Sequence, residues 1–180
     1  MENQDAQNLA RRWITDSELN LGGRAYEDAL WTAVNAIEDL VPELDYSAMI
    51  PVEDAELPPH LSPETRALQE LLVICDGYLF RITGWVDSDS AIEVAIKRVR
   101  VSDFNEPTIT ENRIDVNRAD VRRRGWEFLH RDGSRLLLKT DRIVNANYER
   151  EDPEEFAQEL SRLAGWDVST DSSRAPITII

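Results

Sequence analysis

The sequence is poor in the residues that most often carry metal binding and covalent catalysis. It holds one cysteine, Cys75, and two histidines, His60 and His130, among 180 residues. A single cysteine forms neither an internal disulfide nor a cysteine-based zinc site, and the apolar run around Cys75 indicates a small, buried hydrophobic side chain. Neither histidine has a partner at a spacing typical of metal ligands, so we expect no metal site.

Sequence motifs for common cofactors and reactions are also absent. The chain has no G-x-x-x-x-G-K-[ST] phosphate loop, no G-x-G-x-x-G turn and no G-x-S-x-G nucleophile elbow. Asp87-Ser-Asp-Ser90 begins like a calcium loop, but Ala91 and Ile92 stand where a further ligand and the turn glycine belong. We therefore expect no cofactor and a protein that is not an enzyme. A deep pocket that holds a carboxylate with a raised pKa would favour the enzyme reading.

Long hydrophobic segments are missing as well. No run of eighteen apolar residues occurs, and the acidic segment Met1–Asp5 precedes no apolar leader. These features predict an intracellular, cytoplasmic protein. The net charge of −15 disfavours non-specific binding to nucleic acid and to anionic membranes, because both carry negative charge.

The charge is unevenly distributed along the chain. Residues 1–76 hold 16 acidic and 4 basic side chains, whereas residues 96–142 hold 8 acidic and 12 basic ones. Strand alternation would let basic residues from several strands build one positive face, which we interpret as a surface for a partner protein. The candidate partner-binding residues are Lys97, Arg98, Arg100, Arg122, Arg123, Arg124 and Trp31. The alternative is internal pairing of the arginines with the acidic N-terminal region or the C-terminal helix, since opposite charges in one compact chain attract each other.

Two helices are expected in the first quarter of the chain. Residues 5–14 can form a short helix, and an apolar stripe at helical spacing predicts a second helix over residues 26–41. Trp31 falls beside this stripe, so it is either a peripheral core residue or a contact for a partner. We expect the second helix to cover one face of a hairpin formed by residues 124–140.

The segment that follows is rich in proline. Four prolines between residues 42 and 60 predict an extended acidic connector. Ser62 and Pro63 have the residue types of a helix cap and first turn, so we expect a short helix that holds Leu68, Leu71 and Leu72. Residues 71–75 fit either the end of that helix or a strand.

Alternating apolar residues then predict a series of short strands. Asp76-Gly77 predicts a two-residue turn before a strand over residues 78–86. Strands over residues 91–101 and 108–116 follow. The apolar parity within 91–101 shifts at Val99, which is what a β-bulge produces.

Asp132-Gly133 predicts a β-hairpin between strands 124–131 and 134–140, because this pair readily takes the positive φ angles of a two-residue type I′ turn. In that register Arg131 faces Ser134. One face then holds Trp126, Phe128, His130, Arg135, Leu137 and Lys139, and the other holds Glu127, Leu129, Arg131, Ser134, Leu136 and Leu138.

A last short strand over residues 143–148 leads into the helix with the clearest signals. Asp152-Pro153 has the residue types of a cap and first turn, an apolar stripe runs from Phe156 to Leu163, and Gly165 fits the left-handed position after a helix. We expect this helix to dock on the hairpin and Trp166 to pack back on Leu160.

Several stretches within residues 71–166 carry a resemblance to a known family. They are Ile114–Val121, Gly125-Trp126, Asp132-Gly133, Leu136–Leu138 and Glu151–Leu160. Seven short strands closed by an amphipathic helix resemble the pleckstrin-homology-like (PH-like) fold, and the last part resembles the small PH-like domains of bacteria. The resemblance implies a scaffold for protein or ligand contacts. Family members that bind phosphoinositides use basic residues around the first strand pair, where this chain has Asp76-Gly77.

These features together predict an α+β protein in three parts. An acidic helical region with its connector (residues 1–62) packs on a strongly bent, PH-like antiparallel sheet or partly open barrel closed by the C-terminal helix (residues 63–168), and a tail follows (residues 169–180). We interpret the chain as a non-catalytic protein-interaction or regulatory protein. The alternative is an acidic inhibitor, an immunity protein or a nucleic-acid mimic, that binds a basic partner protein.

Overall fold

The computed structural model describes residues 4–18, 21–51, 66–86, 92–116, 119–140, 144–145 and 153–166. The helices are α1 (Gln4–Asp16), α2 (Gly23–Ile37) and α3 (Pro153–Leu163), with the 3-10 turns η1 (Val41–Glu43) and η3 (Val101–Asp103). The strands are β1 (Leu44–Ile50), β2 (Arg66–Ala67), β3 (Glu70–Cys75), β4 (Tyr78–Val86), β5 (Ile92–Arg100), β6 (Thr108–Val116), β7 (Ala119–Leu129), β8 (Arg135–Lys139) and β9 (Val144–Asn145). All strand pairs are antiparallel, so the α+β class is confirmed.

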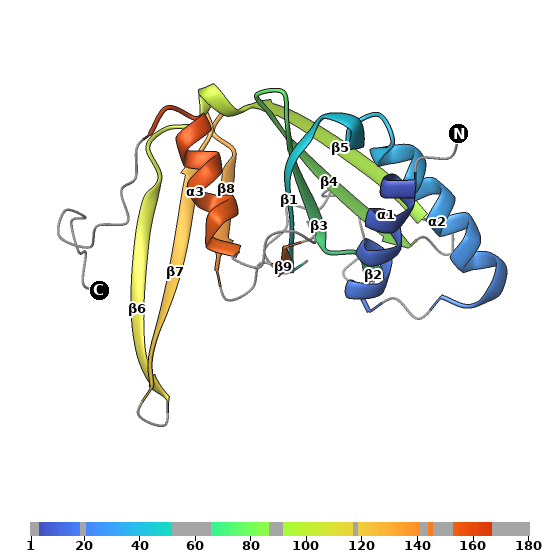
Figure 1. Ribbon diagram of the computed structural model, residues 1–180, viewed down its shortest axis with the longest axis horizontal. Helices are drawn as coiled ribbons and strands as arrows, with labels where there is room; N and C mark the ends of the chain where they lie inside the picture. Colours follow the sequence, from blue (N-terminus) through green and yellow to red (C-terminus); the bar gives the residue numbers. More distant parts are fainter. Residues whose placement is uncertain are drawn as a thin grey trace.

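The described chain has three layers (Figure 1). In the first sheet, β9, β1, β3 and β4 lie side by side in that order. Strand β2 pairs with the same edge of β4 as β3 does, and β5 pairs with the opposite edge of β4. Helices α1 and α2 cover one face of this sheet, as expected for the N-terminal region, and the second sheet, β6-β7-β8, lies with α3 on the other face. No closed barrel forms within the described ranges. Among the same residues, no helix is long and apolar enough to span a membrane.

The first sheet is buried on both faces, which accounts for two errors of prediction. In β3, Leu71 and Val73 belong to the core under the helices, whereas Leu72 and Ile74 belong to the core under the second sheet. A strand buried on both faces has no apolar alternation. The predicted short helix over residues 62–72 is therefore wrong where it can be checked, because β2 and β3 occupy its described part.

The predicted connector is also wrong in its first part. Residues 44–50 form β1, which pairs with β3 on one edge and with β9 on the other. Residues 47–50 are all buried, so this part of the central strand lacks the alternation of apolar and polar residues that marks a strand with one exposed face. Residues 52–60 lie outside the described part of the chain, as do the predicted turn at 87–90, the cap Asp152 and the tail 169–180.

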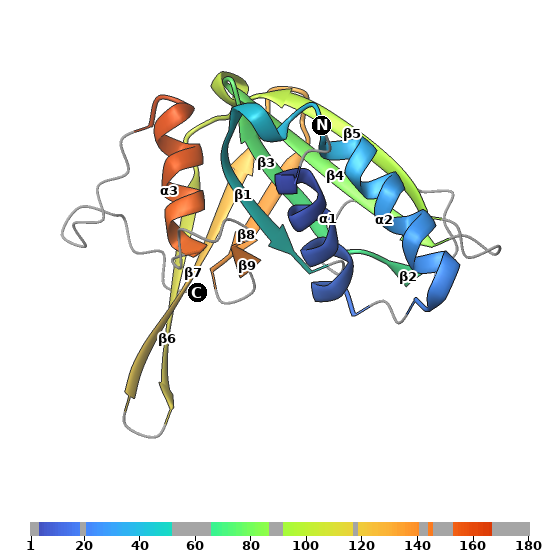
Figure 2. The same cartoon turned by 45° about the vertical axis from the view of Figure 1, so that its right-hand side comes forward.

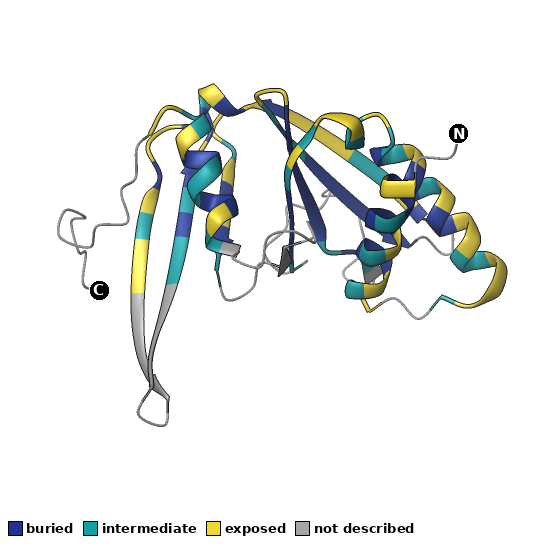
Figure 3. Ribbon diagram, viewed as in Figure 1, coloured by how far each residue is buried: buried dark blue, intermediate teal, exposed yellow. Residues whose placement is uncertain are grey.

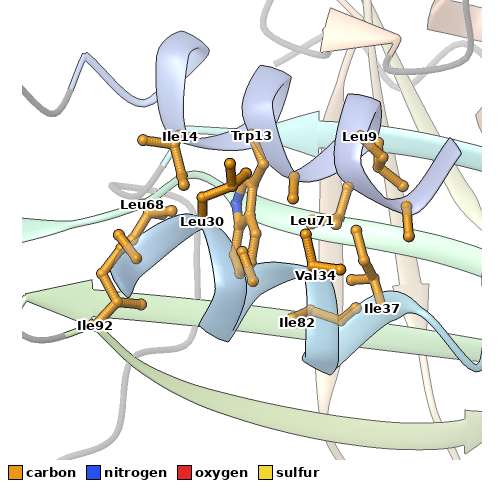
Figure 4. Close-up of a cluster of buried hydrophobic side chains, with 14 of the residues drawn as sticks. Leu9, Trp13, Ile14, Leu30, Val34, Ile37, Leu68, Leu71, Ile82 and Ile92 are labelled. Carbon is orange, nitrogen blue, oxygen red and sulfur yellow. The ribbon is translucent and has the colours of Figure 1, made fainter. Parts of the chain in front are cut away.

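Trp13 is the largest side chain of the core between the helices and the first sheet (Figure 4). It is fully buried, and its indole Nε1 donates a hydrogen bond to the carbonyl oxygen of Gln69 at 2.6 Å. The space for the indole depends on Gly84 in β4. A Cβ atom at Gly84 would lie 3.1 Å from Leu68 Cδ1 and 3.2 Å from the Trp13 ring, so a larger residue would displace one of them.

Strand β5 has no β-bulge, contrary to the prediction. Its register with β4 is continuous from Tyr78 opposite Arg100 to Val86 opposite Ile92. The shift in apolar parity has another cause, because Ile92 packs in the core under the helices and Val99 packs in the core under the second sheet. One regular strand therefore changes the face that it buries along its length.

The two Asp-Gly pairs form different turns. Asp76 and Gly77 have φ values of 47° and 73° in a two-residue turn, as predicted. At the second pair only Gly133 has positive φ, 87°, and the His130 N–H donates to Ser134 O across a three-residue loop. The predicted register is therefore wrong by one residue on β8.

This register gathers the apolar residues of the hairpin on one face. Phe128 lies opposite Leu136 and Trp126 lies opposite Leu138, and all four are buried with Phe156 and Leu160 of α3. Helix α3 thus docks on the hairpin as expected, whereas the predicted cover by α2 is wrong. On the opposite face of the hairpin, Leu129 and Leu137 are exposed. Figure 3 shows the central strands of the first sheet as buried, whereas β6 of the second sheet carries exposed residues.

Candidate protein-binding surface

The predicted partner-binding residues lie on three different elements rather than on one basic face. Lys97, Arg98 and Arg100 belong to β5 of the first sheet. The three consecutive arginines 122–124 belong to β7 of the second sheet, in the hairpin with β6 that extends from the body in Figure 1. Trp31 lies on α2 and is 47% exposed.

Arg124 forms ion pairs within the protein. Its side chain is only 16% exposed and forms an ion pair with Glu154 of α3 and another, at 3.5 Å, with Glu111 of β6. Its backbone N–H and carbonyl oxygen also bond to Thr140. The alternative of internal pairing with the C-terminal helix is therefore confirmed for Arg124. The side chains of Arg122 and Arg123 lie outside the described residues.

A group of exposed and half-buried residues lies together on β4 and β5, and we call it the β5 patch: Ile96, Arg98 and Arg100 are exposed, whereas Tyr78 and Phe80 are half-buried. Tyr78 lies opposite Arg100 and Phe80 opposite Arg98, so alternation places these side chains on one face of the sheet. Helices α1 and α2 pack on the same face of the sheet, nearer the end of β4 and the start of β5. The β5 patch begins where the two helices no longer cover that face.

Three side chains of the β5 patch, Tyr78, Phe80 and Arg98, contact one another in sequence. The guanidinium carbon of Arg98 lies 4.7 Å from the centre of the Tyr78 ring, which is a cation–π geometry. The Tyr78 and Phe80 rings are 6.4 Å apart. Ile96 is 48% exposed, and within the described residues neither Arg98 nor Arg100 has an acidic partner at ion-pair distance. The patch thus offers aromatic, aliphatic and cationic groups to a partner.

Lys97 projects from the opposite face of β5. Its Nζ lies 3.8 Å from Asp132 Oδ2 at the tip of the β7–β8 hairpin, and the side chain is 44% exposed. Strand β5 pairs with β4 along one edge only, and no described strand pairs with its other edge. Cationic side chains therefore lie on both faces of β5, whose outer edge has no strand partner among the described residues.

Sequence reasoning identified the basic residues of β5 and missed its apolar neighbours. Tyr78, Phe80 and Ile96 were interpreted only as strand residues. Pairing the consecutive strands 78–86 and 91–101 as a hairpin would have brought Tyr78 and Phe80 close to residues 97–100, but only the structure gives the register that sets Phe80 opposite Arg98. The apparent bulge at Val99 obscured that register.

His130 and Asp132 form the described pair that most resembles catalytic machinery. His130 Nδ1 lies 2.9 Å from Asp132 Oδ1, an arrangement that can orient an imidazole ring. The other ring nitrogen, Nε2, is buried, and the ring packs edge-on against Phe104 at 5.1 Å. A substrate on the surface would not reach Nε2, so the pair fits a structural role at the hairpin end.

Cys75 and the surface of α1 carry no catalytic arrangement either. Cys75 is buried as predicted, and burial is the main cause that raises the pKa of its thiol, which disfavours the reactive thiolate. The hollow lined by residues of α1 holds the ion pair between Arg12 and Asp16, at 3.1 Å. Within the described ranges, no three His, Cys, Asp or Glu residues are grouped to hold a metal ion.

Replacing Asp132 with asparagine should weaken the hairpin at neutral pH. Hydrogen bonds from Ser134, and then the nearby His130, hold the pKa of Asp132 well below its usual range. The ionised carboxylate therefore stabilises the folded state above pH about 4, and this contribution is lost as pH falls below that value. Because Asp132 is exposed, we expect Asp132→Asn to lower the free energy of unfolding at pH 7 by under about 1 kcal/mol.

Urea denaturation at pH 7 and at pH 3 measures this effect, with the exposed Asp39→Asn as the matched control. The difference between Asp132→Asn and the wild type should shrink at pH 3, since the Asp132 carboxyl group of the unfolded wild-type chain is then largely protonated and the unfolded state gains stability relative to the folded one. A difference that grows in acid would contradict this role for Asp132.

The fold and the surface define an antiparallel α+β protein with an exposed aromatic and cationic patch. Comparison with protein-family models, with curated proteins and with solved structures finds no match to this chain.

Proposed function

We propose that this chain is a non-catalytic protein-interaction or regulatory protein that contacts its partner through the β5 patch, with Trp31 as a further contact. The observation that carries the proposal is the composition and exposure of the patch. Tyrosine, phenylalanine and arginine are enriched in protein interfaces, and an exposed isoleucine beside them adds apolar area to bury. Arg98 and Arg100 are available to acidic groups of a partner.

The order of elements supports a PH-like scaffold as part of this proposal. Strands β1, β3, β4 and β5 form one antiparallel meander, β6, β7 and β8 form a second, and the amphipathic helix α3 follows. Helices α1 and α2 are additions on the outer face of the first meander. In this interpretation they complete the core and leave the β5 end of that face open.

The acidic inhibitor is the second candidate, and the exposure of acidic residues near α2 favours it. Glu27 and Asp28 are exposed on α2, Asp39 and Glu43 are exposed between α2 and β1, and Asp45 is exposed at the start of β1. A basic partner could bind this surface through charge, in which case raising the ionic strength would weaken binding steeply.

The two candidates predict different results in affinity capture from the native cell extract. The wild-type chain is compared with Arg98→Glu/Arg100→Glu, which reverses the two cations of the β5 patch. Arg11→Glu/Arg24→Glu is the matched control, because it makes the same change in net charge on exposed residues of α1 and α2. Under our proposal the wild type and the control retain the same partner, and the Arg98/Arg100 variant retains less than about a tenth of it.

Retention by all three chains, with release only at high salt, would instead support the acidic inhibitor. Under both candidate functions, Trp31→Ala is expected to reduce the amount of partner captured without changing the salt dependence of capture.

A further inference from the structure

We infer that the free edge of β5 takes up an extended acidic segment of the partner as an added strand. This inference rests on the proposed function. It specifies that the edge of β5 next to the β5 patch is the binding element, and it states the chemistry of the segment that binds there. In such a complex the partner backbone bonds to β5, while alternate side chains contact the residues on its two faces.

The backbone of β5 is suited to this role. Its nine residues, Ile92–Arg100, keep a regular register with β4 and contain neither a bulge nor a proline. Figure 2 shows β5 as the outermost strand of the first sheet, beside α2. The N–H and C=O groups that point away from β4 have no strand partner among the described residues, and an edge of this kind is a template for another strand.

The side chains along the edge define the chemistry of the segment. Ile96 and Arg98 lie on the face of the β5 patch, and Lys97 lies on the other face, all three exposed. At the C-terminal half of β5 an added strand would therefore meet Arg98 and Arg100 on one face and, on the other, Lys97, whose Nζ also lies 3.8 Å from Asp132 Oδ2. Acidic residues at neighbouring positions, with an apolar residue opposite Ile96, would complement this pattern.

A second copy of the chain fits this edge poorly. Two β5 strands side by side would bring two sets of Lys97, Arg98 and Arg100 into one narrow interface. Glu93 is the one acidic side chain that each β5 would contribute. Charged edge residues prevent self-association in many β-proteins, and the same charges leave the edge open to an acidic strand.

The experiment uses a displayed library of random nine-residue peptides that lack cysteine, selected on the full wild-type chain. The peptides with the highest enrichment are synthesised, and their affinities are measured by fluorescence polarisation. The chains compared are wild type, Ile96→Lys, Arg98→Glu/Arg100→Glu and the control Arg11→Glu/Arg24→Glu. Ile96 is 48% exposed, so its replacement leaves the fold intact, and a thermal melt of each variant verifies this.

The Ile96→Lys variant separates strand addition from simple charge attraction. It removes the apolar contact and adds a positive charge, so a peptide held by charge alone would bind it as well as the wild type or better. We expect acidic peptides that bind Ile96→Lys and the Arg98/Arg100 variant at least about tenfold more weakly than wild type and control. Amide hydrogen exchange in β5 should slow when the peptide binds.

Three results of the peptide selection would overturn the inference. They are the enrichment of basic peptides, the enrichment of peptides that bind Ile96→Lys as tightly as wild type, and no enrichment at all. The proposed function is judged separately, since the capture experiment depends on a native partner and on no assumption about strand addition. A concentration-dependent dimer that Ile96→Lys abolishes would assign the edge to a second copy and would also overturn the inference.

Discussion

Replacing Arg81 with methionine is expected to lower the free energy of unfolding by about 3–5 kcal/mol, the range for removing one partner of a buried ion pair. Glu70 and Arg81 are 1% and 5% exposed and lie on neighbouring strands of the first sheet. Arg81 donates from Nε to Glu70 Oε1 at 2.6 Å and from Nη2 to Oε2 at 3.1 Å. Its Nη1 also donates to the carbonyl oxygen of Arg135 at 3.1 Å, so one side chain joins the two sheets.

The double variant Glu70→Leu/Arg81→Met is the matched control. It removes both charges and keeps similar volumes, so it should be closer to wild type in stability than Arg81→Met alone. Urea denaturation followed by circular dichroism measures all three chains. A single variant within about 1 kcal/mol of wild type would show that the pair is not buried in solution as it is in the structure.

Replacing Trp13 with alanine should cost a similar amount, about 3–5 kcal/mol, because it opens a large cavity between the helices and the first sheet. Trp13 is fully buried among residues of α1, α2 and the sheet, and Figure 4 shows its indole between them. The variant also leaves the Gln69 carbonyl oxygen without the indole N–H that bonds to it.

Trp31→Ala is the control for this prediction, since it removes the same side chain from the exposed side of α2. At 47% exposure we expect a change within about 0.5 kcal/mol. Chemical denaturation of both variants measures the difference. Equal losses for Trp13→Ala and Trp31→Ala would contradict the assignment of Trp13 to the core and Trp31 to the surface.

The fold could be predicted where the signals are local. Helix α3, strand β4 and the Asp76-Gly77 turn were all predicted from a few adjacent residues, because caps, turns and apolar stripes act over one or two turns of chain. The hairpin at Asp132-Gly133 was predicted, but its loop length was not. One residue of slip placed Leu136 and Leu138 on the wrong face, since side chains alternate along a strand.

The fold could not be predicted where a strand is buried on both faces. Residues 47–50 of β1 and 71–75 of β3 are all buried and show no alternation, so residues 44–50 were predicted as part of a connector, and residues 71–75 fitted either the end of a helix or a strand. Which face of β5 is buried also changes along the strand, with Ile92 under the helices and Val99 under the second sheet.

The sequence by itself determined the α+β class, most of the helices and turns, the uneven charge and the lack of known cofactor motifs. Only the tertiary structure decided which arginine is exposed and which is paired within the protein. Arg124 is held by Glu154, whereas Arg98 lies exposed over Tyr78, although both are arginines in strands. The physical reason is that helices and turns form through contacts between neighbours in sequence, while burial and ion pairing depend on which distant layer covers each face.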